Sequence, residues 1–247
     1  DGVLNLGYGS INSIVQVGCG GTGGYIQYFL SRLLYSMETH SRPRYILCDG
    51  DLVEAKNLCR QNFVDSDLGQ NKAEKLATRY GNVYNLSIEY VDSYIEDQNT
   101  LIQLLSANRN QDIPVLIGAV DNNASRQLFH QVFNKLDTII YIDSGNDEIT
   151  GQVVCGIKYK GNILLPPLGE VYPDVLEDHD TIFKSQMSCG EQVVSEPQNI
   201  ATNIMAGQIV FGYLNDLLIR ENLKVHMTTF NSETMSARSR YIEDLEK

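Results

Sequence analysis

The chain has 247 residues, 43% of them hydrophobic and 20% charged, which is the composition of a globular protein and excludes collagen, coiled coil and wholesale disorder. Lys and Arg number 19 against 31 Asp and Glu, so the formal net charge is −12, and such acidity argues against a nucleic-acid partner. No apolar run approaches the roughly 20 residues that span a bilayer, and the five widely spaced cysteines are typical of reduced thiols, so we expect a cytoplasmic protein without a membrane segment.

The first part of the chain alternates between predicted strands and helices. Short apolar runs indicate buried strands, and apolar residues at helical spacing indicate helices. We expect strands over 13–17, 45–48, 87–91, 115–119 and 138–142, and helices over 22–35, 70–80, 100–105 and 124–136. This alternation is typical of βαβ units. It predicts an α/β fold with a Rossmann-like, doubly wound, mainly parallel sheet.

The pattern changes after Gly151. Residues 152–158 and 162–165 are expected to pair as an antiparallel hairpin, residues 166–184 form a predicted crossing loop, and 197–221 is the longest predicted helix. We therefore expect a nucleotide-binding part over about 11–150 and an antiparallel extension over about 151–247. Together they are expected to form a single domain over 1–247.

A glycine-rich turn follows the first predicted strand. Gly18, Gly20 and Gly23 match the pattern G-x-G-x-x-G, and Gly21 lies among them. Small residues let the backbone approach a ligand closely, and the next helix presents free N–H groups to phosphate. Alone, the motif predicts a nucleotide without defining which one, and a tight turn that needs glycine for packing is the alternative.

Carboxylates follow two of the predicted strands. Asp49 ends the second strand, shortly before Asp51, where it would accept hydrogen bonds from ribose hydroxyls; a turn or N-cap aspartate is the alternative. Asp121, followed by Asn122, ends a buried strand at the edge where ligands bind in open α/β sheets. Beside phosphates Asp121 would be a Mg²⁺ ligand, with a helix N-cap as the alternative.

Two cations lie beyond the acidic turn. Arg60 lies between Asn57 and Gln61, and Lys72 starts a predicted helix. Two cations at the mouth of a phosphate loop suit a triphosphate on which negative charge builds up. The alternatives are a surface ion pair for Arg60 and a solvated first-turn lysine for Lys72.

The order of these motifs resembles the ThiF/MoeB/ubiquitin-activating adenylyltransferase superfamily. The resemblance covers about residues 13–218 and rests on Gly18-Cys19-Gly20-Gly21-Thr22-Gly23, Asp49-Gly50-Asp51, Asn57-Leu58-Cys59-Arg60-Gln61, Gly69-Gln70-Asn71-Lys72 and Asp121-Asn122. It implies a site for ATP and Mg²⁺, with Asp121 as the metal ligand. The nucleotide-binding residues that it implies are Gly18, Gly20, Gly21, Gly23, Asp49, Asp51, Asn57, Arg60, Gln61, Lys72, Asp121 and Asn122.

The resemblance also implies an activity. A carboxylate, typically the C-terminus of a ubiquitin-like or sulfur-carrier protein or peptide, would attack the α-phosphate of ATP to give an acyl-adenylate and pyrophosphate. Arg60, Lys72 and Asp121 would be catalytic, and a homodimer is the expected assembly. Cys189, which precedes the last predicted helix, is either an acceptor for acyl or sulfur or a buried structural thiol.

One departure from the family pattern concerns metal. The paired C-x-x-C zinc ligands of many relatives are absent, so we expect no zinc. Two alternatives for the function remain. An NAD-dependent oxidoreductase would explain the glycines and Asp49, but not the order of Arg60, Lys72 and Asp121. A non-catalytic partner subunit would not need these three residues.

Overall fold

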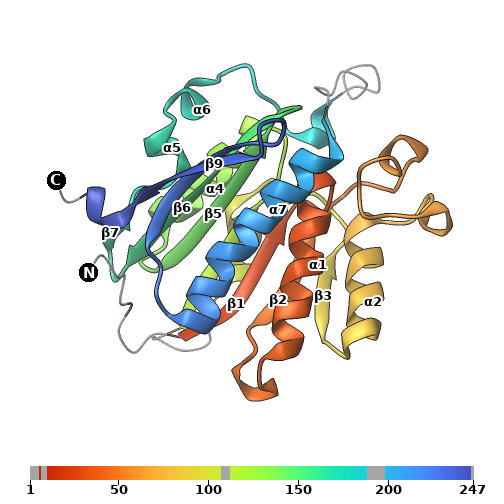
Figure 1. Ribbon diagram of the computed structural model, residues 1–247, viewed down its shortest axis with the longest axis horizontal. Coiled ribbons are helices and arrows are strands. Elements are labelled where there is room, and N and C mark those ends of the chain that lie inside the picture. The colour runs from red at the N-terminus through yellow and green to blue at the C-terminus, as the bar shows by residue number, and fades with distance from the viewer. Residues whose placement is uncertain (1–5, 7–9, 107–111, 188–197, 246–247) are drawn as a thin grey trace.

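The computed structural model describes residues 6, 10–106, 112–187 and 198–245, which build a nine-stranded sheet with helices on both faces (Figure 1). The sheet order is β3-β2-β1-β4-β5-β6-β8-β9, and β7 pairs with the far end of β6. The first five strands are parallel, and β6 to β9 pair antiparallel. Their bounds are β1 Ser10–Val17, β2 Arg44–Cys48, β3 Ile88–Val91, β4 Asp112–Gly118, β5 Ile139–Asn146, β6 Thr150–Tyr159, β7 Asn162–Leu165, β8 Val225–Asn231 and β9 Ser236–Tyr241.

The helices form two layers that cover the central strands. On one face α1, α2 and α7 pack over apolar side chains such as Ile14 and Leu47. On the other face α3 and α4 pack over Val15 and Ile46. Because both faces are covered, β1 is buried from Ser13 to Val17 and β2 from Tyr45 to Cys48, as is usual for parallel strands. The bounds are α1 Gly21–Ser36, α2 Lys72–Tyr84, α3 Gln98–Leu105, α4 Asn123–Lys135 and α7 Ile200–Asn215.

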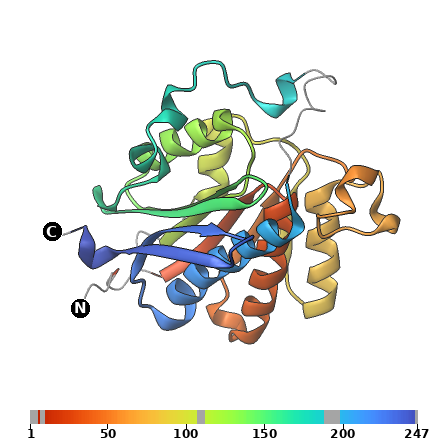
Figure 2. The ribbon, with the colours of Figure 1, turned by 45° about the horizontal axis from the view of Figure 1, so that its top comes forward.

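Short helical turns fill the connections. Two short helices, α5 (Leu168–Val171) and α6 (Asp174–Glu177), lie in the predicted crossing loop, and α7 continues as a π-helical turn over Asp216–Arg220. In Figures 1 and 2 the chain after β7 passes over the edge of the sheet where the parallel strands end. Single 3₁₀ turns span Thr39–Ser41, Ala55–Asn57, Asp65–Asp67, Lys184–Gln186 and Ile242–Asp244.

The prediction of a doubly wound, mainly parallel α/β sheet with an antiparallel C-terminal extension is confirmed. The hairpin of β8 and β9 was not among the predicted elements. All six side chains of β9 are exposed, so this strand carries no hydrophobic alternation, and the turn that joins it to β8 contains neither Gly nor Pro.

The order of the sheet defines where a ligand can bind. The chain moves outward from β1 to β2 and β3 on one side, and returns to add β4 and β5 on the other. At such a switch point the connections leave the carboxyl ends of neighbouring strands in opposite directions and open a crevice between them. In this fold the crevice lies between the ends of β1 and β4.

Candidate functional site

A cavity of about 610 Å³ lies at the carboxyl ends of the parallel strands. It is lined by the glycine-rich turn after β1, the acidic turn after β2, the loop after β4 and the end of β5. The cavity therefore occupies the switch point of the sheet. Eleven of the predicted nucleotide-binding residues line it, namely Gly18, Gly20, Gly21, Asp49, Asp51, Asn57, Arg60, Gln61, Lys72, Asp121 and Asn122.

Gly23, the remaining member of that set, is not among the residues that line the cavity. A Cβ atom on Gly23 would lie 2.1 Å from the carbonyl oxygen of Gly18, so this glycine allows α1 to pack closely against the turn. Gly18 itself has a φ of +103°, and a Cβ there would lie 2.2 Å from the carbonyl oxygen of Ala119. These two glycines shape the turn between β1 and α1.

The turn is held from beneath by Gln16, a fully buried residue of β1 that sequence reasoning missed. Its Nε2 donates to the carbonyl oxygens of Gly18 (3.0 Å) and Gly23 (2.8 Å). The hydroxyl of Tyr45 donates to the Oε1 of Gln16 at 2.6 Å. Since both the amide nitrogen and the amide oxygen of Gln16 are hydrogen-bonded, Gln16 holds the turn in one conformation before any ligand binds.

Asp49 ties the acidic turn to the glycine-rich turn. Its Oδ2 accepts a hydrogen bond from the backbone N–H of Cys19 (2.7 Å), and its Oδ1 accepts one from the N–H of Asp51 (2.8 Å). Burial and the negative charge of Asp51 raise the pKa of Asp49. The carboxylate thus sits at the junction of the two turns, on the wall of the cavity.

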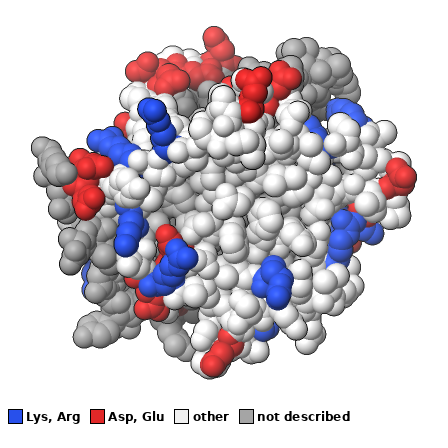
Figure 3. Space-filling model, viewed as in Figure 1, with Lys and Arg blue, Asp and Glu red and all other residues white. Residues whose placement is uncertain are grey.

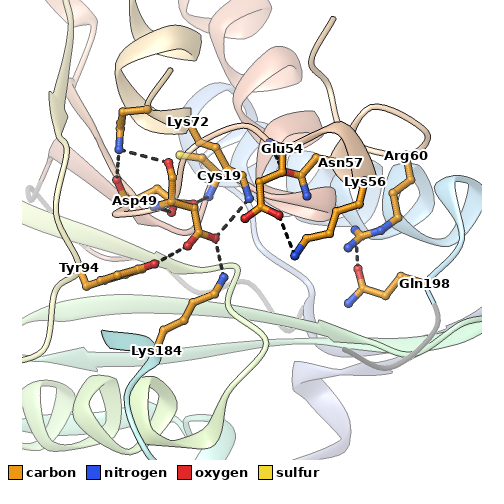
Figure 4. A network of polar contacts seen from close by, with 12 residues as sticks. Cys19, Asp49, Glu54, Lys56, Asn57, Arg60, Lys72, Tyr94, Lys184 and Gln198 are labelled. Carbon is orange, nitrogen blue, oxygen red and sulfur yellow. Dashed lines mark hydrogen bonds and ion pairs between the residues drawn. The ribbon is translucent and has the colours of Figure 1, made fainter. Parts of the chain in front are cut away.

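Asp51 binds two ammonium groups, those of Lys72 and Lys184, which are labelled in Figure 4. The Nζ of Lys72 lies 3.2 Å from its Oδ2, the Nζ of Lys184 lies 2.5 Å from the same oxygen, and the hydroxyl of Tyr94 donates to Oδ1. Burial opposes the ionisation of Asp51, but the two ammonium groups outweigh it and hold the pKa of this carboxyl at about 2. Asp51 is therefore charged at neutral pH.

Lys72 is the first residue of α2, whose N-cap is Asn71. Its side chain is only 6% exposed, so the alternative of a solvated first-turn lysine is wrong. A buried ammonium group needs a partner, and Asp51 provides it. The N-cap of α4 is Asn122, whose Oδ1 accepts from the N–H of Ser125, whereas Asp121 is exposed to solvent. The N-cap alternative for Asp121 is wrong as well.

Arg60 differs from the other cations of the cavity. Its Nη1 donates to the amide oxygens of Gln198 (2.8 Å) and Asn203 (3.4 Å). Within the described part of the chain it has no carboxylate partner, so the alternative of a surface ion pair is not supported. In contrast, each of the other four lining cations has a carboxylate within 4 Å: Lys56 (Glu54), Lys72 (Asp51), Arg126 (Asp143) and Lys184 (Asp51).

Arg126, on α4, joins the cavity to the core beneath it. Its Nε lies 3.2 Å from the Oδ1 of Asp143, and its Nη2 donates to the carbonyl oxygen of Val120 at 2.8 Å. The hydroxyl of Tyr141 donates to the other oxygen of Asp143 (2.6 Å). This buried cluster fixes the loop after β4, and no motif in the sequence indicates it.

Cys189 lies in 188–197, outside the described residues. The other four cysteines are free: Cys59 is exposed, and Cys19, Cys48 and Cys155 are buried. Burial raises the pKa of each buried thiol, that of Cys48 to about 12. These three thiols are protonated at neutral pH and have little nucleophilic character.

The residues that line the cavity fit a Mg²⁺ ion that arrives with a polyphosphate. Over residues 10–106, 112–187 and 198–245, no group of three or more His, Cys, Asp and Glu side chains is placed to hold a metal ion. Mg²⁺ usually keeps several waters and binds one or two carboxylates together with substrate phosphates. The exposed carboxylate of Asp121 on the cavity wall matches that requirement.

The fold and the position of the cavity define a doubly wound α/β protein that can hold a ligand at the carboxyl ends of its strands. The ThiF family model matches residues 10–246, so the chain belongs to the ThiF family. No curated protein sequence matches the chain significantly. Among the helices of the described segments, none has the length and apolar character that crossing a membrane requires.

Solved structures with the same fold include MccB from E. coli and the selenomethionine form of PaaA. PaaA has a TM-score of 0.64 at 18% identity, over 93% of this chain and 64% of PaaA. MccB with ATP has a TM-score of 0.64 at 17% identity, over 94% of this chain and 64% of MccB. MccB with selenomethionine MccA has a TM-score of 0.62 at 18% identity, over 93% and 63% of the two chains. This chain thus spans less than two thirds of the length of these proteins.

Proposed function

We propose that this protein is an ATP-dependent adenylyltransferase that activates a carboxylate as an acyl-adenylate and releases pyrophosphate. The proposed acceptor is the C-terminus of a peptide or of a ubiquitin-like or sulfur-carrier protein. Membership of the ThiF family and the motif series at the cavity support this proposal. MccB structures with ATP and with MccA show that a protein of this fold can hold both a nucleotide and MccA, which supports a two-substrate reaction.

The observation that carries the proposal is the position of Arg60 beside the N-terminus of α1. A Cβ atom on Gly21, the first residue of α1, would lie 2.5 Å from the Nη1 of Arg60. Helices α2, α3, α4 and α7 each have a side chain that caps the N-terminus, whereas Gly20 supplies none for α1. An uncapped helix N-terminus and a cation that has no carboxylate partner among the described residues together form a site for phosphate.

The remaining nucleotide contacts follow from the cavity wall. We place the ribose at Asp49, whose carboxylate can accept hydrogen bonds from hydroxyl groups. Gln61 is 7% exposed and its Oε1 has no hydrogen-bond partner within the described residues, which supports a contact with a bound ligand. Asp121 would hold Mg²⁺, which would withdraw charge from the phosphates when bound.

The chemistry requires little beyond positioning and charge. A carboxylate oxygen attacks the α-phosphorus, the bond from that phosphorus to the oxygen that bridges to the β-phosphate breaks, and pyrophosphate leaves. No general base is needed because the carboxylate is ionised at neutral pH. Arg60 and Lys72 stabilise the negative charge that develops on the departing pyrophosphate.

Cys189 would act only after adenylation. Its thiolate would attack the acyl carbon of the adenylate, the bond from that carbon to the phosphate oxygen would break, and AMP would leave. Adenylation itself uses no thiol. We therefore expect a Cys189→Ala variant to keep pyrophosphate exchange and to lose any reducible adduct with the acceptor.

We also propose that the protein forms a homodimer in the cytoplasm. Helix α7 has no charged residue between Ile200 and Asn215, yet Ile200 and Ile204 are exposed. Tyr28 and Tyr35 of the neighbouring α1 are exposed as well. Figure 3 shows that the centre of this face carries few charged side chains and that most of them lie around its margin. An apolar face of this kind supports a protein partner, here a second copy.

The test of the proposed function has two stages. Thermal unfolding with MgATP, with NAD and without ligand identifies the nucleotide, because a ligand that binds only the native state raises its stability. Exchange of labelled pyrophosphate into ATP, in the presence of small carrier proteins encoded nearby, then tests adenylation. Stabilisation by NAD alone would favour an oxidoreductase, and no stabilisation by either would favour a non-catalytic partner subunit.

The residue test compares Arg60→Ala with Arg44→Ala. Arg44 is half-exposed, pairs with Glu89 on β3 and does not line the cavity. We expect Arg60→Ala to reduce exchange by on the order of 10²–10³, as the loss of a preorganised electrostatic contact does, and Arg44→Ala to leave it unchanged. Normal exchange in a folded Arg60→Ala variant would refute the assigned role.

A further inference from the structure

The segment after β7 brings a charged side chain to the cavity that no sequence motif indicated. This crossing segment, residues 166–187, is anchored first on α4. The Nε2 of Gln127 donates to the carbonyl oxygens of Val175 (3.0 Å) and Asp178 (2.8 Å). The Oγ1 of Thr181 accepts from the N–H of Ala124 at 2.9 Å, in the first turn of α4.

The far end of the crossing segment is anchored on the loop after β3. The hydroxyl of Ser185 donates to the Oε2 of Glu96 at 2.6 Å. Between the two anchors, Lys184 reaches the cavity and lines it together with the glycine-rich turn. In Figure 4, Lys184 and Lys72 enter the network from opposite sides, one from the crossing segment and one from α2.

The two lysines share one carboxylate but differ in burial. The side chain of Lys72 is 6% exposed and that of Lys184 is 31% exposed, while both bind the Oδ2 of Asp51. Tyr94 already donates to the other oxygen of Asp51. If Lys184 turned away, Asp51 would still be neutralised by Lys72, so no buried charge would be left without a partner. Lys184 is therefore the ammonium group that can leave Asp51 for a second anion, while Lys72 stays beside this carboxylate.

On this basis, and resting on the proposed function, we propose that Lys184 is a phosphate-binding residue of the nucleotide site. Its ammonium group, which lies 2.5 Å from the Oδ2 of Asp51, moves to the polyphosphate of ATP when the nucleotide enters. Because Lys184 belongs to the crossing segment, this segment would respond to the binding of phosphate. If Lys184 only held the crossing segment to Asp51, its replacement would instead change the affinity of every ligand of the cavity by the same factor.

The experiment measures the affinity of MgATP and of adenosine by calorimetry for the wild type and for Lys184→Met. The matched control is Lys158→Met, because Lys158 is partly exposed, donates to the carbonyl oxygen of Asn134 and does not line the cavity. We expect Lys184→Met to bind MgATP about 10- to 100-fold more weakly, the value of one charged hydrogen bond. Adenosine, which has no phosphate, should bind all three proteins within about twofold.

Lys184→Arg should recover most of the MgATP affinity, because it keeps the positive charge. If Lys184→Met does not fold, Lys184→Gln replaces it as the neutral variant. If the wild type and a folded neutral variant bind MgATP with equal affinity, the inference about Lys184 is overturned and the proposed function is not. An equal loss for MgATP and adenosine would also overturn it, since Lys184 would then shape the cavity. A wild type that does not bind MgATP would overturn the proposed function, and the inference with it.

Discussion

Gly21 is the residue at which three parts of the chain meet. The position that a Cβ would take there is 2.5 Å from the Nη1 of Arg60 and 2.5 Å from the Oδ1 of Asn203. Both atoms are at the ends of side chains, so an alanine can be accommodated if these side chains move. The backbone of the turn would then stay in place while Arg60 shifts.

We therefore predict that Gly21→Ala folds normally but binds MgATP about tenfold more weakly, since it displaces one charged contact to phosphate. Calorimetric titration measures the affinity, and circular dichroism checks the fold. Gly212→Ala is the control, because nothing lies within 4 Å of a Cβ on that residue of α7. An unchanged affinity in Gly21→Ala would argue against a phosphate beside Arg60.

The local motifs were sufficient to predict many of the residues that line the cavity. The glycine-rich turn and Asp49 directly follow β1 and β2, at the edge where ligands bind. Arg60 lies later in the connection between β2 and α2, and Lys72 begins α2. Lys184 was not predictable in this way, because it contacts Asp51 across 133 residues of sequence. A lysine in a polar loop has no local pattern that distinguishes a ligand-binding role from solvation.

At the scale of elements, α2 is tied to the turn before it by a buried carboxylate. The side chain of Asp67 is fully buried. It accepts hydrogen bonds from the guanidinium of Arg79 on α2 and from the N–H of Val64 (2.9 Å). The Nζ of Lys75 lies 3.6 Å from the same carboxylate. Burial opposes ionisation, but the hydrogen bonds and the cations outweigh it and lower the pKa of Asp67.

A carboxyl with a lowered folded-state pKa stabilises the fold above its unfolded pKa, about 3.9, and loses this effect as pH falls through the folded-state value. We predict that Asp67→Asn lowers the free energy of unfolding by about 1–3 kcal/mol at pH 7. The difference from the wild type should shrink below about pH 4. Urea titrations at several pH values measure it, with the exposed neighbour Asp65→Asn as the control. A difference that persists undiminished to low pH would contradict this assignment.

Some elements can be predicted from neighbouring residues, whereas others depend on residues far away in the sequence. Helices α2, α3 and α4 begin at side chains that cap their own first turn, Asn71, Asp97 and Asn122, so the local sequence accounts for where they start. The hairpin of β8 and β9 depends on β6 instead, because β8 pairs with residues 150–154 of that strand. Its existence is a property of the sheet, and the exposed side chains of β9 carry no sign of it.

At the scale of the whole molecule, the proposed homodimer places α7 between two subunits. We predict that the wild type sediments as a dimer at micromolar concentration and that Ile204→Asp sediments as a monomer, because a charge in an apolar interface loses its hydration. Sedimentation velocity measures both. Ile163→Asp on β7 is the control, since Ile163 is exposed on a different part of the sheet and should not affect assembly. A monomeric wild type would refute the proposed dimer.

The contact between Arg60 and Asn203 has a consequence for synthesis on the ribosome. The two residues are separated by 143 positions, so the guanidinium group emerges long before the amide that helps to hold it. At 5–20 residues per second, that interval is about 7 to 30 s. During this time a nascent chain already carries its glycine-rich turn, yet it lacks α7, whose Asn203 helps to hold Arg60. Under the proposed function, an incomplete chain that ends before Asn203 would hold Arg60 less firmly and would therefore bind ATP more weakly.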